Sequence, residues 1–168
     1  MAGNNSMRKD ILALLEQNAK LTPDEIAVLL GASAGEIARE IAELEREQVI
    51  CGYGALINWS RMASDAPTTA LIEVKVTPAR GAGFTGIAER IYRFDEVKAV
   101  YLMSGDYDLC VIIEGKSLEE IAMFVSDKLA PLESVLSTAT HFVLRKYKDH
   151  GVIFSQENGA DERMIVSP

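Results

Sequence analysis

The sequence predicts an α+β protein, with an N-terminal winged helix-turn-helix and a C-terminal ferredoxin-like βαββαβ unit. Two capped helix patterns, separated by a short turn that contains glycine, predict the first part. Strand and helix patterns in the order β-α-β-β-α-β predict the second part. The chain has 168 residues, of which 48% are hydrophobic and 25% charged, and this globular composition argues against an intrinsically disordered chain.

The chain is expected to begin with a disordered polar leader over residues 1–6 and a helix over residues 7–18. The apolar face of this helix has i+3 and i+4 spacing and consists of Ile11, Leu12, Leu14 and Leu15. A second helix follows, with Thr22 as its N-cap, Pro23 at the first position and Glu25 completing a capping box. Gly31 ends this helix, because glycine adopts the left-handed conformation at little cost.

The third helix is expected to start at Ser33, with Glu36 completing a second capping box. Its inward face repeats at i, i+4 and i+7 and consists of Ile37, Ile41 and Leu44. Residues 49–57 contain two short β-prone runs beside glycines, which predicts a small hairpin or wing. We therefore expect a winged helix-turn-helix domain over residues 7–59 and a linker over residues 60–67.

The second domain is expected over residues 68–150. Its first strand, 68–76, alternates, so that one face consists of Ala70, Ile72, Val74 and Val76. A loop over 78–83 leads to a helix marked by Phe84, Ile87, Ala88 and Ile91. Strands over 97–103 and 109–113 flank a tight turn. A helix capped by Ser117 and stopped by Pro131 follows, with a face of Leu118, Ile121, Ala122, Val125 and Leu129, and a long strand over 135–146 completes the unit.

Both helices of this unit are expected on one face of the sheet, which leaves the other face to be covered. Tyr101, Met103 and Phe142 are among the residues that we expect a partner subunit to cover, which predicts a homodimer built through this domain. The tail, residues 151–168, contains the apolar triplet Met164-Ile165-Val166 and is expected either to add an edge strand or to fray.

The sequence shows no pattern for a membrane, metal or catalytic site. No apolar run approaches the roughly 20 residues that span a bilayer, and the start lacks the apolar core of a signal peptide, so a cytoplasmic protein is expected. Cys51 and Cys110 are expected to be buried free thiols. His141 and His150 lack metal-ligand spacing, and no nucleophile lies in a recognisable motif with a base, so no metal, cofactor or catalytic residue is expected.

A helix-turn-helix that binds DNA places its second helix in the major groove, although a short helical bundle can imitate the pattern. The candidate DNA-binding residues are Arg39, Ser33, Arg46, Arg8 and Lys9. Arg39 is expected to face the groove with Glu36, Glu40 and Glu43 beside it, and the net charge of the whole chain is -8. Because carboxylates oppose binding to phosphate, we expect weak binding per subunit that depends on oligomers engaging several sites.

A second candidate site is the turn Gly105, Asp106, Tyr107 and Asp108. Glycine and aspartate are common turn formers, so an ordinary hairpin turn explains these residues. Alternatively, backbone groups freed by Gly105, together with the carboxylates, hold the ammonium group of a small zwitterion.

These features together resemble the Lrp/AsnC family, the leucine-responsive or feast/famine transcriptional regulators, from residue 7 to about residue 151. The N-terminal half matches the family's DNA-binding domain at Asp10, Ile11, Leu12, Leu15, Asn18, Ala27, Ser33, Arg39, Leu44, Glu45, Val49, Ile50, Gly52 and Tyr53. Val97, "SGDYD" at 104–108 and "VLSTATHFVLRKYK" at 135–148 are similar to the family's effector-binding RAM domain.

The resemblance implies a cytoplasmic regulator that binds double-stranded DNA and forms dimers that associate further, often into octamers. It also implies a small effector, usually an amino acid, which binds between dimers and changes DNA affinity or assembly. By this likeness Gly105, Asp106, Tyr107 and Asp108 line the effector pocket, and Thr138 and Thr140 are candidate additions.

Two alternatives remain open at this point. A sensor or scaffold with the same fold but without strong DNA contact would explain the acidic third helix. An enzyme is the other alternative, because siroheme decarboxylases resemble this family's fold. The second domain, with 10 basic and 12 acidic residues over 67–150, is poorly suited to a polyanionic tetrapyrrole.

Overall fold

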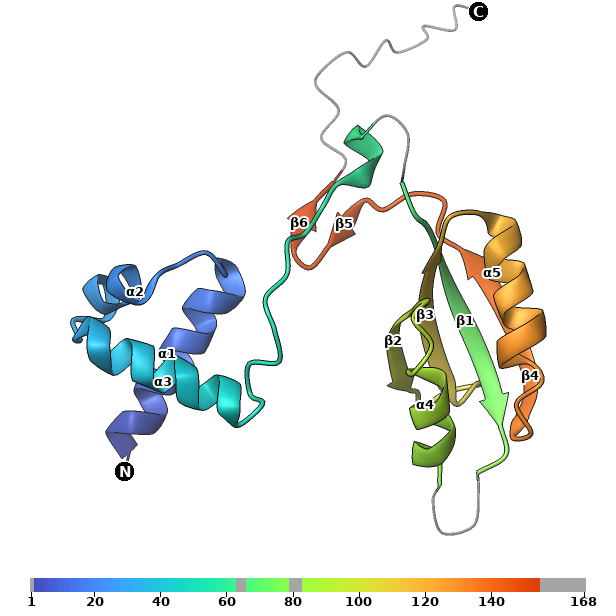
Figure 1. Cartoon of the computed structure of the whole chain (residues 1–168), viewed down its shortest axis with the longest axis horizontal. Coiled ribbons are helices and arrows are strands. Elements are labelled where there is room, and N and C mark those ends of the chain that lie inside the picture. Colours follow the sequence, from blue (N-terminus) through green and yellow to red (C-terminus); the bar gives the residue numbers. More distant parts are fainter. Residues whose placement is uncertain (1, 63–65, 79–82, 155–168) are drawn as a thin grey trace, which may run out of the picture. The chain divides into compact units, whose positions relative to one another are not determined.

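The computed structural model describes residues 2–62, 66–78 and 83–154. The chain divides into two compact units, Met1–Leu56 and Ile57–Pro168, and each has its own hydrophobic core. The first unit consists of α1 (Ala2–Gln17), α2 (Pro23–Leu30) and α3 (Ala34–Arg46), as Figure 1 shows. Its buried core residues come from all three helices and include Ile11, Leu15, Ile26, Ile37 and Leu44.

The expected disordered leader is wrong for residues 2–6, because α1 begins at Ala2; Met1 lies outside the described residues. Extending an existing helix adds one hydrogen bond for each residue ordered, so the helix nucleated by residues 7–17 continues through this polar segment.

The caps that define the helix-turn-helix form as predicted. Thr22 Oγ1 accepts a hydrogen bond from Glu25 N at 3.3 Å, and Glu25 Oε2 accepts one from Thr22 N at 2.8 Å. Gly31 has a φ of 65°, the left-handed conformation expected at this C-cap. Ser33 caps α3 by accepting from Glu36 N at 3.2 Å, but the Glu36 side chain returns no bond, so the second capping box is half formed.

The hairpin expected over residues 49–57 does not form, and this segment contains no strand. The amides of Val49 and Ile50 instead bond to Leu44 O at 2.9 and 3.1 Å and close the C-terminus of α3. The Tyr53 hydroxyl donates to Glu45 Oε1 at 2.8 Å. Amides that complete a helix end are not available for a strand ladder, and a lone two-stranded hairpin is only marginally stable.

The second unit has the predicted β-α-β-β-α-β order. Its elements are β1 (Thr68–Val76), α4 (Thr85–Ile91), β2 (Val97–Leu102), β3 (Leu109–Gly115), α5 (Leu118–Phe124), η2 (Val125–Leu129) and β4 (Val135–Phe142). The four strands form one antiparallel sheet in the order β2-β3-β1-β4. This is the ferredoxin-like topology. Part of the expected loop over 78–83, residues 79–82, lies outside the described residues.

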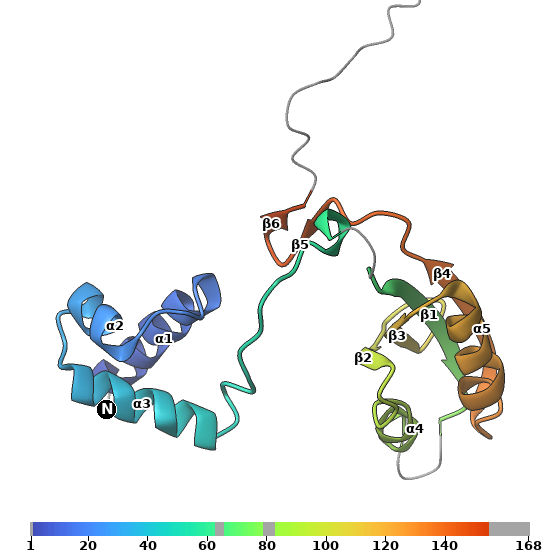
Figure 2. The same ribbon diagram turned by 45° about the horizontal axis from the view of Figure 1, so that its top comes forward.

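One face of the sheet is covered by both helices, as the two views in Figures 1 and 2 show. The predicted inward face of β1 is confirmed: Ala70, Ile72, Val74 and Val76 are all buried. They pack with Ile87 and Ile91 of α4 and with Ile121, Phe124 and Leu129 from α5 and η2. Two residues expected on the α5 face, Leu118 and Ala122, are exposed, and Phe124 takes the buried place.

The opposite face of the sheet, called here the open face, contains Tyr101 but not Phe142. Tyr101 is 55% exposed and lies opposite Cys110, and Met103, 40% exposed, follows β2 directly. Phe142 lies opposite the buried Ala70 and packs into the helix-covered core, which corrects its expected position. Strand register decides this, because a shift by one residue moves a side chain to the other face.

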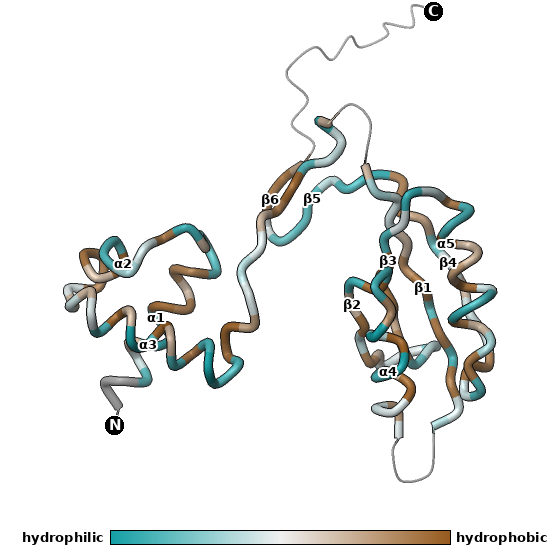
Figure 3. Tube along the Cα trace, in the orientation of Figure 1, coloured by the Kyte–Doolittle hydropathy of each residue, from teal (hydrophilic) through white to brown (hydrophobic). Residues whose placement is uncertain are grey.

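The last strand, β4, ends at Phe142, four residues earlier than predicted. Val143 N still bonds to Thr69 O at 2.9 Å, but β1 begins at Thr68, so only one residue of β1 remains beyond this point. Lys148–Asp149 (β5) and Val152–Ile153 (β6, brown in Figure 3) form a separate short hairpin that the sequence did not reveal. Asn58 Nδ2 donates to Phe154 O at 3.0 Å beside η1 (Trp59–Arg61). The Met164-Ile165-Val166 triplet lies outside the described residues.

Candidate functional site

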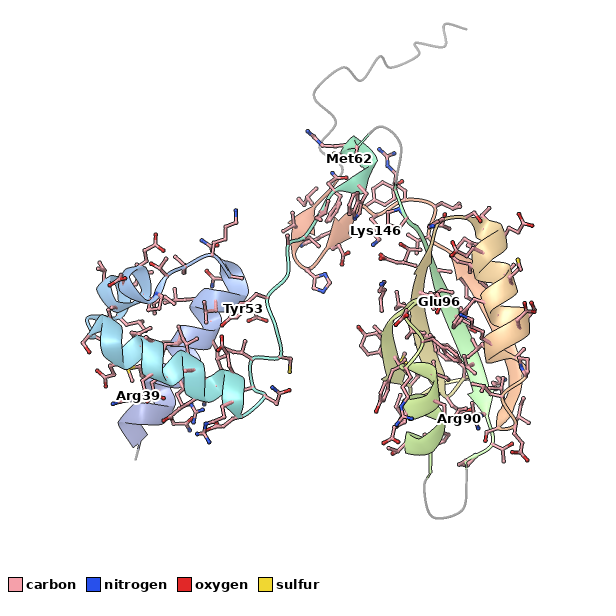
Figure 4. All side chains as sticks on the ribbon, viewed as in Figure 1. Arg39, Tyr53, Met62, Arg90, Glu96 and Lys146 are labelled. Carbon is pink, nitrogen blue, oxygen red and sulfur yellow. The ribbon has the colours of Figure 1, made fainter. Side chains whose placement is uncertain are left out.

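The surface of α3 carries Arg39 in an exposed position (Figure 4). Arg39 forms no ion pair or hydrogen bond with the described part of the chain, so its guanidinium is available to a ligand. The two exposed alanines at positions 38 and 42 lie on the same helix. A helix with a free cation and small neighbours can approach a phosphate backbone and the base edges of the major groove.

The surroundings of Arg39 are less acidic than expected, because Glu40 is buried. Its side chain is 5% exposed and lies with Ile37 and Leu44 on the inward face of α3. Glu36 is exposed and Glu43 is half-buried. One of the three carboxylates expected to flank Arg39 is therefore turned away from the exposed surface, which reduces its opposition to a nucleic-acid phosphate.

The other candidate DNA-binding residues have different environments. Lys9 and Arg46 are exposed and form no ion pair with described residues. The Ser33 hydroxyl is already engaged as the N-cap of α3. Arg8 Nη2 donates to Glu47 Oε2 at 2.5 Å, and Arg8 Nε lies 3.9 Å from Glu40 Oε2. The hydrogen bond to Glu47 raises the pKa of the Arg8 guanidinium above its ordinary value, so Arg8 is charged and held within its own unit.

The second candidate site is the turn between β2 and β3. Met103 N bonds to Asp108 O at 2.8 Å and closes it. Gly105 and Asp106 are exposed at its tip, and Asp106 forms no hydrogen bond or ion pair with the described residues. The turn therefore presents an unpaired carboxylate beside an open backbone, the arrangement that the zwitterion hypothesis needs.

Asp108 has a structural partner that the sequence did not reveal. Its amide donates to Val74 O at 3.1 Å, and its Oδ2 accepts a hydrogen bond from Val76 N at 2.8 Å. The side chain thus satisfies a donor at the end of β1 and fixes the turn to this strand. Tyr107 is half-buried, and its pKa is raised by burial and, to a smaller extent, by Cys110 and Glu73. Cys110 and Glu73 lie opposite each other on the open face of the sheet.

Thr138 and Thr140 lie on β4, away from the tip of this turn. They are half-buried and pair with Val74 and Ile72, whose side chains point into the helix-covered core. Asp108 and Thr138 flank Val74 on opposite sides, two strand spacings or about 10 Å apart. Within one chain, the turn at residues 105–108 contacts β1 through Asp108. Thr138 and Thr140 do not lie beside this turn.

Cys110 is buried as expected, whereas Cys51 is exposed, because the segment around it has no partner strand. Across residues 2–62, 66–78 and 83–154, no helix is long and apolar enough to cross a bilayer. The same described residues contain no cluster of three His, Cys, Asp or Glu side chains that could hold a metal ion.

The first unit has the helix-turn-helix fold of DNA-binding proteins, and it is followed by a separate ferredoxin-like unit. Family models match both parts of the chain: "Winged helix-turn-helix DNA-binding" over residues 5–50 and "Lrp/AsnC ligand binding domain" over residues 69–153. The chain belongs to the Lrp/AsnC family, and it is a DNA-binding transcriptional regulator of the helix-turn-helix type. The expected fold class is confirmed by the same matches.

A relative supports the family, and two solved structures share the fold. The uncharacterized HTH-type transcriptional regulator YugG of Bacillus subtilis is 49% identical over 95% of this chain and 95% of its own length. The transcriptional regulator NMB0573 of Neisseria meningitidis, solved with L-Met, has a TM-score of 0.68 and 23% identity, over 85% of this chain and 91% of its own. The feast or famine regulatory protein Rv3291c of M. tuberculosis, complexed with L-methionine, has a TM-score of 0.68 and 17% identity, over 86% and 94% of the two chains.

Proposed function

We propose that this cytoplasmic protein regulates transcription in response to an amino acid, through DNA contacts centred on Arg39 and an effector site at residues 105–108. It acts by binding and not by catalysis. The observation that carries the proposal is the pair of free, oppositely charged groups on the two units, Arg39 on α3 and Asp106 on the β2–β3 turn.

The proposed DNA surface is the exposed side of α3 together with Lys9. Arg39 and Arg46 lie seven residues apart, two turns of one helix, and both are exposed. Ser33 contributes through its position at the N-terminus of α3, where backbone amides attract a phosphate. So few cations give weak binding to a single site, and we propose that oligomers engage several sites at once.

The proposed effector is an amino acid whose ammonium group binds the Asp106 carboxylate. Solved relatives of the same fold carry L-methionine. Because Gly105 and Asp106 are exposed, one chain supplies only part of an enclosed site, and we propose that other subunits complete it. Thr138 and Thr140 remain candidate residues for the site.

The open face of the sheet is the proposed dimer surface, and dimers then associate further, as in an octamer. Tyr101 and Met103 expose large apolar side chains there, and Leu71 and Ile112 are half-buried on the same face. A monomer that left this sheet face in water would lose the hydrophobic stabilisation that burial provides. Sedimentation equilibrium of the full chain tests this, because a monomer at micromolar concentration would contradict it.

The DNA proposal is tested by titrating the full chain against the DNA upstream of its own gene at low and moderate salt. Arg39→Ala is expected to abolish the specific shift and to reduce the slope of log K against log salt by about one. Lys20→Ala removes the same charge from an exposed loop and serves as the matched control. If neither salt gives a sequence-specific shift, the chain is a sensor or scaffold without DNA contact.

The effector proposal is tested by thermal shift and by the same titration with L-methionine and other amino acids. A ligand that binds only the native state raises its apparent stability, and coupling between the two sites is expected to change DNA affinity by about 5–150-fold. Asp106→Asn is expected to abolish both effects. Equal responses of the variant and the wild type would place the effector elsewhere.

A further inference from the structure

The inward face of α3 contains a buried carboxylate without a full set of partners. Ile37, Glu40, Ile41 and Leu44 follow the i, i+3, i+4, i+7 spacing of a core stripe. Glu40 is buried, like Ile37 and Leu44, and its Oε2 has no hydrogen-bond partner among the described residues. A charge in such a position is costly unless an opposite charge compensates it.

The compensating charge comes from α1. Arg8 precedes Ile11 by three residues and Leu15 by seven, so it extends the buried stripe of α1 toward the N-terminus. Its Nε lies 3.9 Å from Glu40 Oε2, and its Nη2 donates to Glu47 Oε2 at 2.5 Å. One guanidinium thus contacts two carboxylates that are seven residues, or two turns, apart along the same side of α3.

This geometry fixes α3 against α1 at two points. Glu40 lies in the middle of α3, and Glu47 is its C-cap residue. Rotating α3 about its axis, or sliding it along α1, would lengthen at least one of these contacts. Arg39, which directly precedes Glu40, is the exposed cation whose direction depends on that rotation.

We propose that Arg8 and Glu40 are positioning residues. They set the rotation of α3 relative to α1, and thereby the direction in which Arg39 points, whereas Arg8 does not itself contact DNA. The inference deepens the proposed DNA function and rests on it for its effect on affinity. It replaces the expectation that Arg8 is a DNA-binding residue.

The test compares Arg8→Met, Glu40→Leu and the double variant in the full chain, with Lys20→Met, outside the proposed DNA surface, as the control for loss of an exposed cation. DNA affinity is measured at a temperature where every variant is fully folded. Arg8→Met alone leaves Glu40 buried without a charge partner and is expected to weaken binding at least about tenfold. The double variant replaces the pair by apolar side chains and is expected to bind within about threefold of the wild type.

Three results would overturn the proposal. If the double variant binds as weakly as Arg8→Met, with a salt slope reduced by about one, Arg8 contacts phosphate directly. If Arg8→Met lowers Tm but leaves DNA affinity unchanged, the pair serves stability alone. If urea unfolding of the four proteins shows no coupling between the two positions, the pair does not exist.

A DNA-independent readout separates this inference from the proposed function. Hydrogen exchange of the α3 amides is expected to accelerate in Arg8→Met and to recover in the double variant. If the wild type binds no DNA but exchange recovers, the seating of α3 by the pair stands and the DNA proposal fails. Unchanged exchange in Arg8→Met refutes the positioning role whatever the DNA result.

Discussion

Replacing Asp108 by alanine should destabilise the second unit, because this side chain completes the sheet. Asp108 Oδ2 accepts a hydrogen bond from Val76 N at 2.8 Å, and Val76 is 3% exposed, so water cannot easily replace the lost acceptor. A buried amide left without a partner costs about 1–3 kcal/mol. For domains of this size range, each kcal/mol corresponds to a fall in Tm of roughly 2–8 °C.

The assay is urea unfolding of the full chain at neutral pH, followed by circular dichroism, with Asp108→Asn and Asp106→Ala as controls. Asp108→Asn keeps an oxygen that can accept the Val76 amide, so it should lose less than half as much stability as the alanine variant. Asp106 has no partner among the described residues, and Asp106→Ala should leave the free energy of unfolding within about 0.5 kcal/mol of the wild type. Equal stability of Asp108→Ala and Asp106→Ala would refute this account of Asp108.

Two further predictions concern the helix cap and the core. Thr22→Ala should lower the free energy of unfolding of the first unit by about 0.5–2 kcal/mol, measured by urea unfolding. Hydrogen bonds from the Thr22 amide and, to a smaller extent, from its hydroxyl lower the pKa of Glu25 below its ordinary value, so the stability that they contribute is present at neutral pH and is lost as the pH falls through the lowered pKa. Thr22→Ala removes the bond from the hydroxyl but keeps the larger effect of the backbone amide, so the loss of stability in acid should become shallower without disappearing; a steeper acid profile would contradict this account. Phe124→Ala should cost about 3–5 kcal/mol in the same assay, because this ring is 4% exposed and contacts Phe94 edge-to-face at 5.4 Å; a loss below 1 kcal/mol would contradict its place in the core.

Several elements could be predicted from the sequence because their determinants are local. Thr22, Glu25 and Gly31 specify the ends of α2 through bonds that span three or four residues. The alternation of Ala70, Ile72, Val74 and Val76 predicts both the strand and its buried face, because a strand's side-chain period is two. The turn at residues 104–108 is likewise local in its backbone chemistry.

The candidate site was only partly accessible in this way. The sequence identifies Arg39 and the Gly105–Asp108 turn as the residues of interest, but it places Glu40 among the acids that flank Arg39 and does not reveal that Arg8 contacts Glu40 and Glu47. The i+3 step from Ile37 to Glu40 was the one signal that Glu40 belongs to the buried stripe. The spacing did not lead to a buried position being predicted for Glu40, because carboxylates are rarely buried without a partner.

By itself, the sequence determined the helix-turn-helix, the order of the ferredoxin-like unit and the face of β1 that is buried. Only the tertiary structure decided which face Phe142 occupies, where β4 ends, what Asp108 accepts and which carboxylates hold Arg8. These features depend on register between strands and on contacts between residues 32 or more positions apart. The physical reason is that periodicity reports which side of an element is apolar, whereas pairing depends on which element packs against it.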